Sequence, residues 1–288
     1  MKDAKNALGE ANHHLPPAIK PRLWLLWLVA SLTCLAILGG AAWFYHHSYR
    51  AEAASAAGEA NKTVNAFTEH TLQLINQVDA LLRGMRWVYQ QTGSIALTER
   101  FVHELEFDHA VVENLYLISA EGIIVLAHNP AARNISIADR GYFHYHQMTP
   151  KDRLSISSVE KGRVTGKYQF RISRRIDNPD GSFGGLVLAT VVPESFTRYY
   201  HSLQAGVGHT AALLGTEDHL LRARIPEPNP DKWATPTETP LWAALAQAPS
   251  GTYETASAFD GIRRLFTYRQ VGDLPLVCLL YTSPSPRD

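Results

Sequence analysis

The segment at residues 139–143, with the sequence DRGYF, places an arginine beside two aromatic residues. A guanidinium group is planar and can form paired hydrogen bonds with a carboxylate, and aromatic rings can enclose an aliphatic or cationic group. Arg140 and Tyr142 are therefore the first candidates for ligand contacts, and Phe143 is a third. The alternatives are structural, with Arg140 paired to a nearby aspartate and Phe143 buried in a core.

Polar and apolar residues alternate at residues 168–176. Alternate side chains of a strand point to the same face, so one face of this predicted strand is polar. Its members are Gln169, Arg171, Ser173 and Arg175. Arg171 and Ser173 are further candidates for ligand contacts, made from the sheet. The alternative is that Arg171 lies on a solvated face.

Other chemistry is not indicated by the sequence. Among the thirteen histidines, His144 and His146 are two residues apart, so this pair lacks the spacing of three or four that is typical of metal ligands on a helix. The sequence has no G-x-S-x-G, Walker A or H-E-x-x-H motif. We therefore predict no metal, no cofactor and no catalytic residue.

The composition limits the class of protein. A share of 45% hydrophobic and 19% charged residues is typical of a folded chain. The 27 basic residues equal the 27 acidic ones, so no net charge draws the chain to nucleic acid. The chain has two cysteines, Cys34 and Cys278, so the residues between these positions cannot form a disulfide framework.

Residues 23–45 are uncharged and long enough, as a helix, to cross a bilayer. A cleavable signal peptide is the alternative, but its apolar region would be shorter. Basic residues are more frequent before this segment than after it, which predicts a cytoplasmic N-terminus and an extracytoplasmic domain from about His46 onward.

A long helix is predicted after the span, because no proline interrupts residues 48–91 and apolar residues recur at alternating intervals of three and four. These positions are Val64, Phe67, Thr71, Leu74, Val78, Leu81, Met85 and Val88. The stripe could pack on the sheet that follows. It could also pair with a second subunit, starting from the alanine-rich residues 51–60, and we expect a homodimer.

Strands and turns follow the helix. Residues 114–119 and 123–127 form one predicted hairpin, and 168–176 and 185–192 form a second. A helix at 193–203 leads to a smaller unit. This unit comprises strands at 209–214, 220–224 and 253–258, a helix at 241–247, and a closing hairpin at 262–271 and 274–277.

Four motifs accompany this order of elements: NLYLISAEGIIVLA (114–127), ADRGYFHYH (138–146), FRISRRIDNPDGSFGGLVLATVVPESF (170–196) and FDGIRRLFTYRQVGDLPLV (259–277). Over residues 23–277 the chain resembles the double Cache (dCache) family of bacterial extracytoplasmic sensors. The resemblance implies an α+β fold, in which a transmembrane helix and a long signalling helix carry two PAS-like modules with antiparallel sheets.

The resemblance also implies a division of the chain. We expect a cytoplasmic N-terminus at 1–22, a transmembrane helix at 23–45, a long extracytoplasmic helix at 46–92, a membrane-distal module at 93–204 and a membrane-proximal module at 205–277. The distal module would bind a ligand in the periplasm and signal across the inner membrane. The expected output is a diguanylate cyclase of the GGDEF type; the alternatives are a histidine kinase, a chemoreceptor or a stand-alone anchored binding protein.

In this family the segment that matches residues 139–143 lies over the ligand pocket. The branch that binds amino acids has a tyrosine five residues before the motif arginine and a tyrosine that closes the aromatic pair. Here these positions hold Ile135 and Phe143. Asp177 is a candidate for the later acidic partner of that branch. The departures argue against an α-amino acid and leave another small carboxylate, or an amine, as the expected ligand.

The sequence changes character at residues 278–288, CLLYTSPSPRD. This run is what the DNA of a transposon-end sequencing adapter encodes, so we expect it to be foreign to the natural protein, with a genuine C-terminal tail as the alternative. Prolines and polar residues fill 281–288, and we expect no buried strand there.

Overall fold

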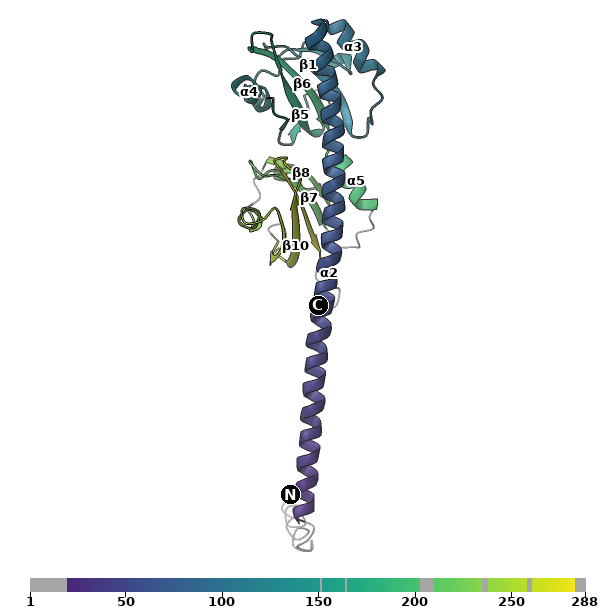
Figure 1. Ribbon diagram of the computed structural model, residues 1–288, viewed down its shortest axis with the longest axis vertical. Coiled ribbons are helices and arrows are strands. Elements are labelled where there is room, and N and C mark those ends of the chain that lie inside the picture. The colour runs from purple at the N-terminus through teal and green to yellow at the C-terminus, as the bar shows by residue number, and fades with distance from the viewer. Residues whose placement is uncertain are drawn as a thin grey trace, which may run out of the picture. The chain divides into compact units, whose positions relative to one another are not determined.

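The computed structural model describes residues 20–150, 152–163, 165–202, 210–234, 238–257 and 261–282. Helix α2 (Lys20–Thr92) contributes to two compact units, Met1–Ala56 and Ala57–Asp288 (Figure 1). Within the described residues, one helical segment is long and apolar enough to cross a membrane, Trp24–Ser48, and its large apolar side chains are exposed. The side chains at 49–56 are not described, so much of the expected dimer contact lies outside the described part.

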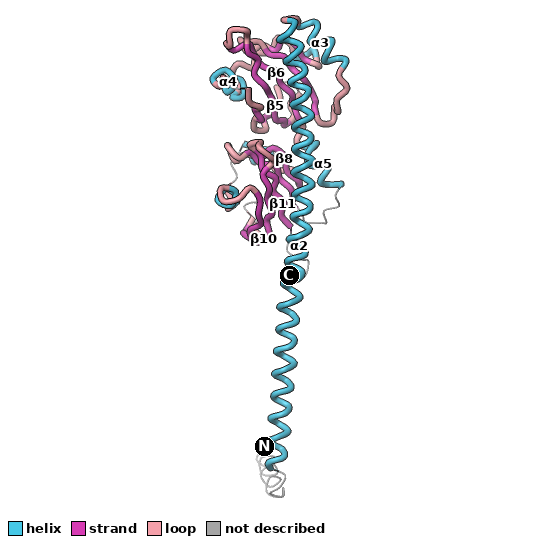
Figure 2. Tube along the Cα trace, in the orientation of Figure 1, coloured by secondary structure: helices cyan, strands magenta, loops and turns pink. Residues whose placement is uncertain are grey.

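The second unit contains two antiparallel sheets, which are drawn in magenta in Figure 2. The first sheet has the order β2-β1-β6-β5-β3, and the short strand β4 also pairs with β5. Its strands are β1 (Val112–Ile118), β2 (Ile124–Ala127), β3 (Ser155–Ile156), β4 (Glu160–Lys161), β5 (Tyr168–Asp177) and β6 (Phe183–Val191). With helices α3 (Ile95–Glu104), η1 (Pro130–Ala132) and α4 (Gly141–Met148), it forms what we call the first module.

The second sheet has the order β8-β7-β11-β10-β9. Its strands are β7 (Thr210–Gly215), β8 (Leu221–Ile225), β9 (Ser250–Ala256), β10 (Arg263–Gln270) and β11 (Leu276–Thr282). With helices η2 (Pro230–Ala234) and α6 (Leu241–Leu245), it forms the second module, and α5 (Glu194–Ser202) precedes it. In both sheets the first strand pairs with the last, so the α+β fold with two PAS-like modules is confirmed.

The predicted hairpins are present. Strands β5 and β6 are joined by the turn at 178–182, where Gly181 has a φ of 81° and the Asp180 side chain accepts a hydrogen bond from the Ser182 N–H at 2.9 Å. Asparagine, aspartate and glycine are favoured in such turns because they bond to nearby backbone or adopt positive φ. Turn chemistry therefore fixes the register that puts Arg171 opposite Thr190.

The apolar stripe of helix α2 packs on the sheets. Of its eight positions, six are buried and Leu81 and Val88 are partly buried. Phe67 contacts Tyr200 of α5 edge-on, with ring centroids 6.1 Å apart, and Thr71 accepts a hydrogen bond from Cys278 of β11 at 3.8 Å. Burying one large apolar side chain contributes roughly 1.5–3 kcal/mol. Packing on the sheets is therefore the role of this stripe over residues 64–85.

Strand β11 corrects one expectation. It continues beyond Val277 to Thr282, and Cys278, Leu279, Leu280 and Tyr281 are all buried. The strand lies between β7 and β10, and these residues pair on both sides. The physical reason is that residues 278–281 are apolar, whereas the strand-breaking prolines come later. Residues 283–288 lie outside the described part.

Candidate ligand-binding site

A cavity of about 40 Å³ lies against the face of the first sheet that is opposite to helix α2. Isoleucines and a leucine form its apolar wall. The polar part of the wall is formed by Tyr116, Arg140, Tyr142, Arg163, Thr165, Gln169, Arg171 and Thr190. Three of the candidates from the sequence, Arg140, Tyr142 and Arg171, are thus brought together.

Arg140 reaches the cavity from the N-terminus of helix α4. It occupies the N-cap position in an extended conformation, with φ −81° and ψ 138°, and its side chain makes no capping hydrogen bond. Its Nη1 instead donates to Oε2 of Glu160 at 2.6 Å. Arg140 therefore pairs with Glu160 rather than with Asp139 or Asp177, and Asp139 itself accepts a hydrogen bond from Arg163.

Arg171 reaches the cavity from strand β5 and is 4% exposed, so it does not lie on a solvated face. Its Nη1 donates to the backbone oxygens of Gln169 at 3.0 Å and Glu160 at 3.3 Å. The Glu160 carboxylate lies 3.8 Å from the same nitrogen. Burial lowers the pKa of the Arg171 guanidinium, and the charge of Arg140 acts in the same direction. The two arginines thus make a cationic corner.

Neutral donors complete the wall. Burial raises the pKa of Tyr142, and it raises the pKa of Tyr116 to about 12, so both phenols stay protonated at neutral pH. Gln169 is 2% exposed, and its Nε2 has no hydrogen-bond partner among the described residues. A buried donor without a partner is costly, so a ligand oxygen at this place would be stabilising.

The structure places the other three candidates elsewhere. Phe143 belongs to the core beneath α4 and packs edge-on against Phe183, with ring centroids 5.4 Å apart. Ser173 is buried beneath His146, 2.9 Å from its Nε2, and Asp177 accepts a hydrogen bond from Arg175 Nε at 2.5 Å. None of the three lines this cavity. Ligand contacts of these three residues therefore stay a prediction, and they would lie outside this cavity.

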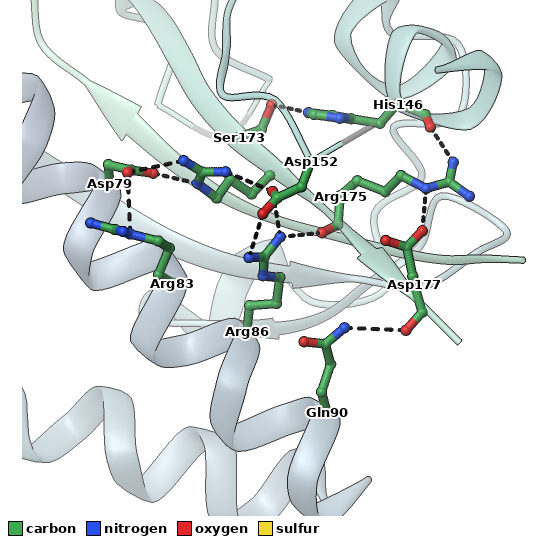
Figure 3. A network of polar contacts seen from close by, with 10 residues as sticks. Asp79, Arg83, Arg86, Gln90, His146, Asp152, Ser173, Arg175 and Asp177 are labelled. Atoms are coloured by element: carbon green, nitrogen blue, oxygen red, sulfur yellow. Dashed lines mark hydrogen bonds and ion pairs between the residues drawn. The ribbon is translucent and has the colours of Figure 1, made fainter. Parts of the chain in front are cut away.

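Strand β5 is tied to α4 by a polar network (Figure 3). Besides the bond between Ser173 and His146, the Arg175 guanidinium donates to the backbone oxygen of His146. Burial lowers the pKa of His146 to about 4, so the imidazole is neutral at physiological pH. These contacts fix the position of α4, and hence of Arg140 at its N-terminus.

The same network ties β5 to helix α2. Arg174 donates to both carboxylate oxygens of Asp79, at 2.5 and 3.0 Å, and to Asp152 at 2.6 Å. Asp152 also accepts from Arg86 at 2.7 and 3.0 Å, as Figure 3 shows. One strand therefore carries Arg171 toward the cavity and Arg174 toward the helix, because residues an odd number of positions apart point to opposite faces of a strand.

Sequence reasoning missed several wall residues. Gln169 shares the polar face of the strand with Arg171, so the alternation of polar and apolar residues could have identified it as a wall residue. Tyr116 and Thr190 reach the cavity through pairing of β1 and β6, which places them beside the face of Arg171. Glu160 comes from a short segment whose sequence gives no signal. Across the described part of the chain, no group of three or more side chains is arranged to hold a metal ion.

Comparisons with known proteins agree with this fold. A family model described as a dCache-like histidine kinase sensor domain matches residues 193–280. The extracellular domain of a protein named as the histidine kinase rpHK1S-Z16 is 26% identical, with a TM-score of 0.67, over 78% of this chain and 92% of its own. No curated protein matches the chain.

Two chemoreceptors share the fold at lower identity. The ligand-binding domain of PctC from Pseudomonas aeruginosa PAO1, solved with GABA, is 15% identical with a TM-score of 0.57, over 77% of this chain and 97% of its own. The periplasmic domain of Tlp1 from Campylobacter jejuni is 12% identical with a TM-score of 0.60, over 77% and 92%. The described chain thus has the fold of a dCache-like sensor domain of the kind found in histidine kinases and chemoreceptors.

Proposed function

We propose that this chain is the extracytoplasmic ligand-sensing part of a membrane-anchored signalling protein, and that its ligand binds in the cavity of the first module. The observation that carries the proposal is the convergence on one cavity of Arg140, Arg171 and the Gln169 Nε2, which has no hydrogen-bond partner within the described part of the chain. Ligand sites are typically apolar clefts with a few convergent polar groups, which matches this wall.

The proposed ligand is a small molecule with a carboxylate. Two guanidinium groups favour an anion, and the isoleucines favour a short aliphatic portion. The PctC domain binds GABA, and the PctB domain of the same organism binds L-Gln, which makes small carboxylates with an amine a sensible class to test. Ile135 and Phe143, which replace tyrosines of the amino-acid-binding branch, favour a ligand other than an α-amino acid.

Signalling requires that the ligand prefers one of two conformations, because equal affinity for both shifts nothing. In the proposed arrangement the segment Trp24–Ser48 anchors the chain in the bacterial inner membrane, and residues 93–204 form the membrane-distal module. Homodimerisation along α2 would bring two signalling helices together. A membrane-anchored binding protein without an output module is the remaining alternative to a signalling role.

The output module is a separate part of the proposal. The sequence resemblance favours a diguanylate cyclase. The proteins reported above are instead a histidine kinase and chemoreceptors, so they give no support to a cyclase in particular. The sequence of the complete gene would decide, because a GGDEF domain, a kinase core and a methyl-accepting coiled coil have distinct motifs.

Binding can be tested with the full chain in detergent micelles. Succinate, butyrate, 4-aminobutyrate and L-glutamine would be screened by thermal shift, and hits measured by calorimetry. Arg140→Ala should weaken binding of a hit by roughly 10- to 100-fold, as expected for loss of a charge-assisted hydrogen bond. Arg263→Ala is the matched control, because that arginine is 74% exposed in the second module. A hit whose affinity survives Arg140→Ala in the folded protein would contradict the site.

A further inference from the structure

The cationic corner of the cavity already holds a carboxylate from this chain. Oε2 of Glu160 lies 2.6 Å from Nη1 of Arg140 and 3.8 Å from Nη1 of Arg171. The backbone oxygen of Glu160 accepts a hydrogen bond from Arg171 as well. A ligand carboxylate that used both arginines would therefore need the position of the Glu160 carboxylate.

The size of the cavity supports this competition. One water needs roughly 10–15 Å³ of such volume. A cavity of about 40 Å³ therefore has room for a few waters but not for a molecule the size of 4-aminobutyrate. Gly162, Arg163 and Thr165, which follow Glu160, form part of the wall, so movement of these residues would enlarge the cavity.

The strand that carries Glu160 has few backbone contacts of its own. Strand β4 is two residues long and pairs only with β5, through Glu160 opposite Gln169 and Lys161 opposite Tyr168. The Glu160 side chain is 32% exposed, and Lys161 is exposed. The neighbouring Val159 is buried in the core and Ser157 exchanges hydrogen bonds with Arg171, so the pairing with two arginines adds to these contacts and holds the Glu160 side chain itself.

The same segment faces the second module. A cleft of about 250 Å³ is lined by Glu160 and residues 155–158 on one side, and by Asp218 and Arg222 on the other. Nη2 of Arg222 lies 3.5 Å from the backbone oxygen of Ile156, at the limit of a hydrogen bond. Displacement of Glu160 would therefore alter the contact between the two modules.

We propose that Glu160 is a built-in competitor for the anion site, which a ligand carboxylate must displace, and that its displacement releases residues 155–161 from their contact with the second module. This inference rests on the proposed function, because it assumes that the cavity binds an anion. It supplies the two conformations that signalling requires, one with Glu160 on the arginines and one with the ligand there. It also sets specificity, because a tethered carboxylate acts at a high effective concentration and excludes weakly binding anions.

The test uses acetate, a carboxylate that contains no other recognition group, and the full chain in detergent micelles. Sodium acetate is compared with sodium chloride at equal ionic strength. In Glu160→Ala, acetate should raise the unfolding midpoint by roughly 3–6 °C once it reaches about ten times its dissociation constant. The wild type should shift by less than about 1 °C, because Glu160 already occupies the arginines.

The matched control is Glu99→Ala. Glu99 forms an ion pair with Arg133, and its side chain is 31% exposed, against 32% for Glu160. It differs from Glu160 in that it pairs with one arginine instead of lying near two. Acetate should stabilise this variant far less than Glu160→Ala. An equal shift in the two variants, or no shift in Glu160→Ala, would overturn the proposal.

Release of the segment is measured by hydrogen exchange in Glu160→Gln. This variant keeps the shape of the side chain, so it can be used even if the alanine variant does not fold. The amides of Ser157 and Gly162, which donate to Arg171 and Lys167, should exchange at least tenfold faster than in the wild type. Unchanged protection would overturn the release step. Neither measurement uses the natural ligand, so failure here leaves Arg140-dependent binding intact, and failure of the ligand screen leaves these results standing.

Discussion

Helix α2 buries apolar side chains against both modules, and it adds ion pairs with low exposure at the first module and an exposed hydrogen bond from Arg269 to Asn65 at the second. On the first module, Asp79 of the helix binds Arg174, and Arg86 binds Asp152. On the second, Thr71 accepts the weak hydrogen bond of the Cys278 thiol, and Phe67 packs against Tyr200 of α5, the helix that precedes this module. The strand order is the same in both sheets, so the difference lies in the side chains.

The difference has a consequence for coupling. In the first module one strand, β5, carries both the arginine of the cavity and the arginine that binds the helix. Charged groups held at one geometry respond to small displacements, because their energy depends steeply on distance and burial. We expect the first module to sense and the apolar contact of the second module to serve as the fixed support.

The largest expected effect is the loss of that support. Phe67→Ala should lower the free energy of unfolding by roughly 3–5 kcal/mol, because the side chain is fully buried and leaves a cavity. Chemical denaturation of the chain would measure it. The loss should be the same at low and high salt. Trp87→Ala, which removes a larger ring from an exposed position on the same helix, should change stability by less than about 0.5 kcal/mol.

Removal of the helix-binding carboxylate should have the next largest effect. Asp79→Asn leaves Arg174 with a single partner, and the side chains of the pair are only 11% and 12% exposed. Breaking a fully buried pair costs about 3–5 kcal/mol, so roughly 2–3 kcal/mol is expected here. Asp152→Asn removes the other partner of Arg174, but Asp152 is 51% exposed and the loss should stay near 1 kcal/mol or below. Equal losses of stability in the two variants would mean that burial does not determine how much each ion pair contributes.

Helix α2 and strand β5 also show which features the sequence could predict and which it could not. Helical periodicity predicted that Phe67, Thr71 and Leu74 share one buried stripe, because that signal is local, but it left open whether the stripe packs on the sheets or on a second subunit. Strand alternation correctly placed Arg171 and Ser173 on one face. It could not show that Arg171 meets Glu160 while Ser173 meets His146, because their neighbours come from segments distant in sequence.

The C-terminal strand illustrates the same limit. Composition drew attention to the prolines after residue 282 and away from the short apolar run of 278–281. That run completes the centre of the second sheet. It pairs with β7, which is distant in sequence, and with β10, to which a turn joins it. Pairing on both sides is decided by the whole sheet, so a local reading ended the strand too early.

Acid should weaken the first module before the second. Burial holds the pKa of His146 at about 4 in the folded chain, below its usual 6.5, so the unfolded chain binds the proton more tightly. Stability should therefore fall as the pH drops from about 6.5 toward 4, by roughly 1–2 kcal/mol between pH 7 and 5.

Denaturation of the wild type and of His146→Gln across this range would measure the contribution, and the variant should lack that part of the pH dependence. Hydrogen exchange should locate it, with α4 losing protection at pH 5 while α6, anchored by the fully buried Leu241, does not. Equal loss of protection in α4 and α6 would assign the acid response to other groups.

The smallest effect is expected from an ion pair in the second module, and it tests whether charge alone makes the first module different. Glu254 lies 3.2 Å from Arg263, but their side chains are 59% and 74% exposed. Water already solvates both groups, so Glu254→Gln should change stability by about 0.5 kcal/mol or less, and salt should remove even that. Asp79→Asn, with the same chemical change, should cost several times more. If the two variants were equally destabilised in denaturation measurements, the ion pairs on α2 would be no more than surface contacts, and apolar packing would be the main attachment of the helix to both modules.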